Sequence, residues 1–137
     1  MTKPVSGDVW RYDYLWRWQH EAGETEGRKS RPVAFAAVVA NKAGKTDLFI
    51  LPITSVPPQG RLALEVPQIE RRRAGLDDDK PLWIMLDEYN HDVLEGSFYF
   101  DPTARVGKFS ETFRKLALRS FIEIARKKQT KRVPRGS

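Results

Sequence analysis

The chain has 137 residues, 40% of them hydrophobic and 31% charged, which favours one domain around one core. It contains no cysteine, and this excludes a thiolate nucleophile, a disulfide and a zinc site with cysteine ligands. No stretch approaches the roughly 18 to 20 apolar residues of a membrane-spanning helix. No apolar run of a secretion signal follows Lys3. We therefore expect a cytoplasmic protein that has no membrane partner.

The net charge of +6 is unevenly distributed. Residues 105–137 carry eleven basic and two acidic side chains, a balance of +9, whereas residues 1–104 carry 13 and 16, a balance of −3. Most of the chain is therefore not a general polyanion-binding surface. The basic end is either an anion-binding arm or a solvated helix face, and charge alone favours the second interpretation.

The first predicted element is an aromatic strand over residues 9–14. Its aromatic residues and the two tryptophans after it occupy even positions, which an extended backbone would place on one face. Residues 19–30 change to Glu, Gly, Thr and Lys and predict a long polar loop, a feature that is often functional. The even-numbered aromatic residues are Trp10, Tyr12, Tyr14, Trp16 and Trp18.

Further elements follow in short, turn-punctuated segments. An apolar run at 33–40 predicts a strand buried on both faces, and apolar or alternating patterns predict strands at 48–54, 62–66 and 82–86. A weaker pattern at 93–100 predicts another short strand, and residues 67–76 predict a short helical turn ending near Gly75.

Ser110 is the expected N-cap of an amphipathic helix that runs to Lys128. The last five residues, 133–137, resemble a protease-cleavable linker, so we take residues 1–132 as the domain. The pattern predicts a mainly β protein with helices, a small β-barrel on which the C-terminal amphipathic helix packs.

Three segments of this sequence resemble the MazF/PemK toxins. They are Gly7-Asp8-Val9-Trp10, then residues 26–33 (EGRKSRPV), then Pro52-Ile53-Thr54-Ser55. Their order and spacing agree with that family over roughly the first 60 residues, and the match continues more loosely through residues 75–87. The resemblance implies an SH3-like barrel and a homodimer. It also implies a sequence-specific endoribonuclease of a type II toxin–antitoxin system that cleaves single-stranded RNA, leaving 2′,3′-cyclic phosphate and 5′-hydroxyl ends. A cognate antitoxin protein would be its second partner, and neither a metal nor a cofactor is implied.

By position in the resemblance, Arg31 is the catalytic arginine and Thr54 the second catalytic residue. Cutting RNA through its own 2′-hydroxyl requires positive charge on the phosphorane, and a guanidinium stays protonated at any working pH. An unperturbed guanidinium is a poor base, so we assign Arg31 the charge-stabilising role first. The hydroxyl of Thr54 can bind a phosphate oxygen, and Ser55 is a possible helper; alone, Thr54 would read as an ordinary strand threonine.

The general base is left open between two loop residues. Glu26 matches the loop acid of the family and is taken as catalytic, whereas His20 titrates in a useful range but ranks below it. Arg28 and Lys29 are predicted contacts to the RNA backbone, with a solvated loop as the alternative. Asp87 matches an acid used in some relatives, although Met85 replaces the basic residue expected two positions earlier.

The segment from Tyr14 to Glu21 lengthens the first loop relative to the family. Trp16 or Trp18 could stack RNA bases, yet burial in the core or an interface is the commoner use of such side chains. His91 has no second ligand nearby in sequence, and the three aspartates at 77–79 would point in alternate directions, so no metal site is predicted. Two alternatives to the nuclease stay open: a non-catalytic SH3-like barrel that binds peptide or nucleic acid, and a barrel that inhibits a protein target such as gyrase.

Overall fold

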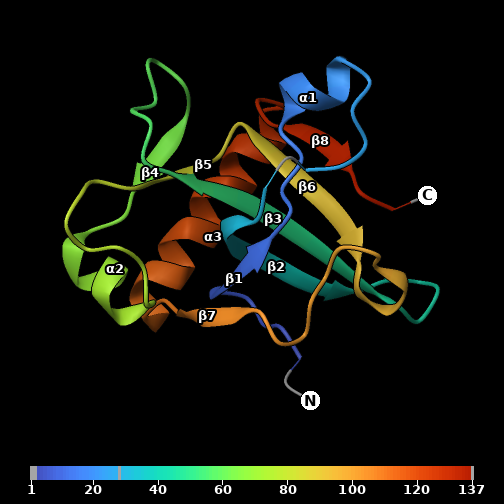
Figure 1. Ribbon diagram of the computed structural model, residues 1–137, viewed down its shortest axis with the longest axis horizontal. Helices are drawn as coiled ribbons and strands as arrows, with labels where there is room; N and C mark the ends of the chain where they lie inside the picture. Colours follow the sequence, from blue (N-terminus) through green and yellow to red (C-terminus); the bar gives the residue numbers. More distant parts are fainter. Residues whose placement is uncertain (1–2, 28, 137) are drawn as a thin grey trace.

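The computed structural model describes residues 3–27 and 29–136, and it is mainly an antiparallel β-sheet accompanied by a few helices (Figure 1). The strands are β1 (Asp8–Tyr12), β2 (Arg31–Ala40), β3 (Thr46–Thr54), β4 (Ala63–Glu65), β5 (Trp83–Met85), β6 (Glu88–Val93), β7 (Arg105–Lys108) and β8 (Lys131–Pro134). The helices are α1 (Arg17–Glu21), α2 (Gln68–Arg73) and α3 (Glu111–Arg126), with a 3₁₀ turn, η1, at Leu94–Gly96.

The long strand β3 organises the sheet. Its first edge pairs with β2, which continues through β1 to β7. Its second edge pairs with β6 along residues 47–50 and with β5 at residues 53 and 54. β4 then pairs with β5, and β8 runs parallel to β6. Among the described residues no pairing joins β4 to β7, so the sheet is not closed.

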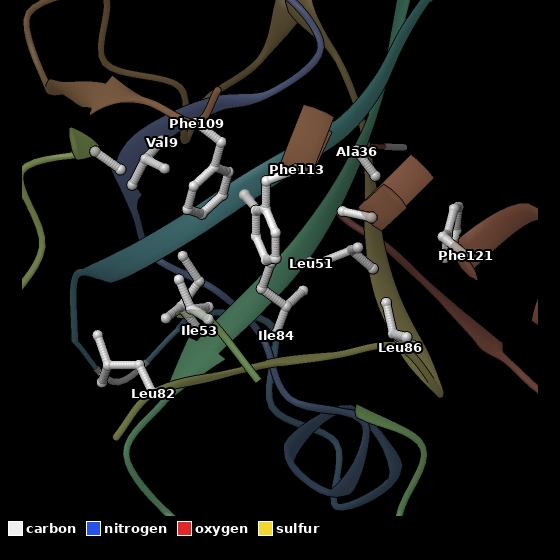
Figure 2. Packing of buried hydrophobic residues seen from close by; sticks show 14 residues of the cluster. Val9, Ala36, Leu51, Ile53, Leu82, Ile84, Leu86, Phe109, Phe113 and Phe121 are labelled. Carbon is white, nitrogen blue, oxygen red and sulfur yellow. The ribbon is translucent and has the colours of Figure 1, made fainter. Parts of the chain in front are cut away.

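Apolar side chains leave both faces of β2 and β3, and this produces two core clusters. On one face, Ala36 and Leu51 pack with Phe113 and Phe121 of α3 (Figure 2). On the other face, Val33 packs with an aromatic cluster that includes Trp10, Tyr12, Tyr14 and Phe35. Residues 33–36 are therefore buried on both faces, as the sequence predicts. The prediction is wrong for the end of the run, where Val39 and Ala40 are exposed.

Helix α3 begins where the sequence predicts. The side chain of Ser110 accepts a hydrogen bond from the backbone N–H of Phe113, 3.2 Å away, and so caps the helix. The same hydroxyl donates to the carboxylate of Glu70 at 2.7 Å, which ties α3 to α2. Phe113, Ala117 and Phe121 form the buried stripe of the helix.

The strand predicted at 93–100 is wrong. The strand instead precedes this segment, as β6 at Glu88–Val93, and the chain then turns through η1 at Leu94–Gly96. The pattern misled because β6 buries its polar residues, Glu88, Asn90 and Asp92, and turns Tyr89 and His91 to partly exposed positions. Beyond η1, the hydroxyl of Ser97 accepts hydrogen bonds from the backbone N–H groups of Tyr99 and Phe100 and stabilises a turn rather than a strand.

The C-terminal residues pack on the domain. Val133 is 1% exposed in β8, and the guanidinium of Arg135 lies 3.7 Å from the centre of the Tyr99 ring. Arg135 also donates to the backbone carbonyls of Asp13 and Thr25, at 3.0 and 2.7 Å. Residues 133–136, set apart from the domain by sequence, thus contact the first loop; their origin as a linker stays a prediction. Within residues 3–27 and 29–136, none of the helices has the length and apolar character to cross a membrane.

Candidate functional site

The two predicted catalytic residues, Arg31 at the start of β2 and Thr54 at the end of β3, lie at the same end of the sheet. The antiparallel register pairs Val33 with Pro52. Continuing this register by two residues places Arg31 opposite Thr54, and facing residues of antiparallel strands project from the same side of a sheet. The predicted pair therefore shares one end of the aromatic face.

Both residues line a single pocket of about 780 Å³. The pocket is also lined by the predicted RNA-backbone contact Lys29, by Ser55, and by Trp16 and Trp18, for which base stacking is one of two interpretations. Of its described lining residues five are basic and one is acidic, so the pocket carries positive charge. The basic residues are Arg11, Lys29, Arg31, Arg61 and Lys80, and the acidic residue is Asp77.

Arg31 is half-buried in this pocket, and its guanidinium lies 5.0 Å from the centre of the Trp16 ring. In the described part of the chain no carboxylate lies within ion-pair distance of it. Burial lowers the pKa of Arg31 from its usual value, because partial loss of water disfavours the charged form. The group is therefore a partly desolvated cation without a neutralising partner in the described residues, and this arrangement suits an anionic ligand.

Thr54 lines the pocket and is 9% exposed. Its hydroxyl oxygen accepts a hydrogen bond from the backbone N–H of Val56 at 3.0 Å. This bond orients the hydroxyl and leaves its own proton available for donation to an oxygen in the pocket. Ser55 follows it and is exposed.

A second arginine, Arg61, was missed by sequence reasoning. It lines the same pocket, but its guanidinium binds Asp87 at 2.6 and 2.9 Å and Glu88 at 2.8 Å. The hydrogen bonds to Asp87 are the main cause that raises the pKa of Arg61. Arg61 alternates with the apolar residues of the strand predicted at 62–66, and this pattern predicts only a solvent-exposed side chain. The local sequence therefore does not indicate that Arg61 belongs to the site. Only the fold brings Arg61 to the carboxylates at the bend between β5 and β6.

The remaining predicted site residues lie elsewhere. Glu26 and His20 are exposed and do not line the pocket, so their roles stay predictions. Asp87 is paired with Arg61 and does not line the pocket either. Arg28 falls outside the described residues. The pocket therefore unites the predicted charge-stabilising groups but not the two base candidates.

The buried polar row of β6 positions Trp16. Asn90 holds the backbone of Leu15 at both ends, accepting from its N–H at 2.8 Å and donating to its carbonyl at 2.7 Å. Glu88 accepts from the hydroxyl of Tyr14 at 3.0 Å and from the backbone N–H of Arg17 at 2.9 Å. These bonds fix the chain on either side of Trp16. The extended first loop is consequently anchored, and its start forms a wall of the pocket.

Trp16 and Trp18 differ in their surroundings. Trp16 is half-buried and packs on the aromatic cluster, as the commoner use of such residues suggests, whereas Trp18 is 54% exposed at the pocket. Within the described residues no group of three or more histidine, aspartate or glutamate side chains is arranged to hold a metal ion. Comparisons of the sequence with protein-family models and with curated proteins found no match.

Proposed function

We propose that this protein is a metal-independent endoribonuclease of the toxin type, which cleaves single-stranded RNA in the pocket at the start of β2 and the end of β3. The observation that carries the proposal is the half-buried guanidinium of Arg31, which has no ion-pair partner among the described residues and shares its pocket with Thr54. A phosphorane formed by attack of the 2′-hydroxyl carries extra negative charge, and a preorganised guanidinium stabilises such charge most where water is partly excluded.

The pocket supplies other elements that the proposed chemistry uses. Thr54 would donate its hydroxyl proton to a phosphate oxygen, and Lys29 would contact the neighbouring phosphate of the strand. Trp18 offers an exposed indole on which an unpaired base would stack. Because stacking of this kind needs a splayed base, single-stranded RNA is the proposed substrate.

The same proposal includes an SH3-like barrel, a homodimer and an antitoxin partner. The antiparallel sheet organised by β3, with α3 packed on one face, is compatible with the proposed SH3-like barrel. The homodimer, the antitoxin and the cytoplasmic location rest on the sequence resemblance, and the basic pocket is compatible with an acidic antitoxin segment.

The test is incubation of the purified protein with a long unstructured RNA in the presence of EDTA. Fragments with 2′,3′-cyclic phosphate and 5′-hydroxyl ends are expected, and Arg31→Ala is expected to lower the cleavage rate by about 100-fold or more. Arg119→Ala is the matched control, because this exposed arginine of α3 does not line the pocket. Absence of cleavage over substrates of varied sequence would reject the nuclease.

One observation favours a second function, binding of single-stranded nucleic acid without cleavage. The described lining contains one carboxylate, that of Asp77, and it forms an ion pair with Lys80 at 3.7 Å. The base candidates Glu26 and His20 lie outside the lining. Tight binding of RNA that stays intact for hours would support this alternative.

A further inference from the structure

Two arginines of the pocket, Arg31 and Arg61, are held by different kinds of partner. Arg61 is neutralised by Asp87 and Glu88, with three hydrogen bonds of 2.6 to 2.9 Å. Arg31 instead rests on the indole of Trp16, at 5.0 Å from the ring centre. The carboxylates at the bend are thus paired with Arg61, and no carboxylate of the described residues pairs with Arg31.

The indole that holds Arg31 is itself fixed. The Trp16 ring meets the Tyr14 ring edge-on, with centres 5.2 Å apart, and Tyr14 is anchored by its hydroxyl on Glu88. The backbone N–H of Trp16 donates to the side chain of Gln19 at 2.9 Å, and Gln19 is 2% exposed. The ring therefore has little freedom to leave the guanidinium.

An aromatic face differs from a carboxylate as a support for arginine. It attracts the cation through the ring quadrupole, yet it neither neutralises the charge nor uses the N–H groups at the edge of the guanidinium. Those N–H groups stay available for two oxygens of one phosphate group. A carboxylate at the same place would compete with the phosphate.

We propose that Trp16 is a positioning residue that holds the guanidinium of Arg31 in the pocket, charged and ready to bind the phosphate of a nucleic-acid strand. The inference rests on the proposed function for the identity of the ligand. It does not require that the strand be cut.

The experiment compares Trp16→Phe, which keeps an aromatic face, with Trp16→Leu, which keeps bulk but has none. The first readout is the dissociation constant for a single-stranded DNA oligonucleotide, which lacks the 2′-hydroxyl and cannot be cut by this chemistry. The second is kcat and KM for RNA of the same sequence. Phe98→Ala is the control, because Phe98 is 83% exposed and does not line the pocket.

Trp16→Leu is expected to weaken DNA binding about 5-fold, the change that corresponds to about 1 kcal/mol of cation–π interaction. Trp16→Phe should stay within about 2-fold of the unmodified protein, and Phe98→Ala should not differ from it. In the unmodified protein, the NMR signal of the Arg31 side-chain Nε–H should show the upfield ring-current shift of a proton over an indole, a readout that needs no variant to fold.

The outcomes separate this inference from the nuclease. RNA cleavage that is equally fast in Trp16→Leu overturns the role of Trp16 and leaves the nuclease standing. DNA binding that depends on the aromatic ring, without any RNA cleavage, supports the role and rejects the nuclease. An unshifted Arg31 signal, Trp16→Phe as weak as Trp16→Leu, or no binding by the unmodified protein each overturns the inference.

Discussion

Replacing Arg61 by alanine tests how the pocket wall is held. The substitution removes the guanidinium from Glu88, whose side chain is 5% exposed, and from Asp87, which is 22% exposed. Glu88 would keep its bonds from the Tyr14 hydroxyl and the Arg17 N–H. Loss of the partner of a fully buried ion pair costs about 3 to 5 kcal/mol. Because the Arg61 side chain is 40% exposed and water can replace part of its bonding, we expect about 2 kcal/mol.

The assay is thermal unfolding followed by circular dichroism. For a chain of this length, 2 kcal/mol corresponds to a decrease in Tm of about 7 °C. Arg72→Ala is the matched control, since Arg72 pairs with Asp78 at 2.9 Å but both side chains are exposed, at 68% and 42%. That pair should contribute less than about 1 kcal/mol. Equal shifts in Tm for the two variants would refute the distinction between the buried and the exposed carboxylate partners.

Two further predictions concern stability. Gly107→Ala should destabilise the protein by about 2 kcal/mol or more in urea unfolding, because the added Cβ would clash with the backbone carbonyl oxygen of Ala74. Gly96→Ala is the control, since its added Cβ meets no atom within 4 Å and the change should be nearly neutral. Comparable losses in both variants would contradict the close approach of β7 to the end of α2. The hydrogen bond from His91, at 3.0 Å, is the main cause that lowers the pKa of Asp47. The Asp47 carboxylate therefore adds stability above its unfolded pKa of about 3.9. This stability is lost as the pH falls through the lower pKa of the folded state. Asp47→Asn should therefore be less stable than the unmodified protein at pH 6 and equal to it near pH 2, and a constant deficit at both pH values would exclude this linkage.

Local patterns predicted most of the elements because the patterns and the burial agree. The apolar runs at 33–40 and 48–54 became β2 and β3, and Ser110 with the spacing of Phe113, Ala117 and Phe121 predicted α3. β6 could not be predicted this way. Its inward residues Glu88 and Asp92 are polar, and their partners are the hydroxyls of Tyr14 and Tyr12, more than 70 positions away in the sequence.

In the candidate site, too, some features follow from sequence position and others depend on contacts between distant segments. Arg31 and Thr54 stand at ends of strands whose antiparallel pairing is the simplest arrangement, so their proximity follows from sequence position. Other features depend on how the first loop and the bend before β6 pack. They are the short helix α1 in the predicted loop, the contact of Arg31 with Trp16 and the ion pair of Arg61 with Asp87. Contacts between such distant segments leave no periodic trace in the sequence.

A double-mutant cycle tests whether Arg31 and Thr54 act on one phosphate group. Dissociation constants for the single-stranded DNA oligonucleotide would be measured for the unmodified protein, Arg31→Ala, Thr54→Val and the double variant. Two groups that bind the same phosphate should be coupled, so the double variant is predicted to lose clearly less affinity than the product of the two single losses. Losses that multiply within error would contradict the claim, because they would show that the two side chains act independently.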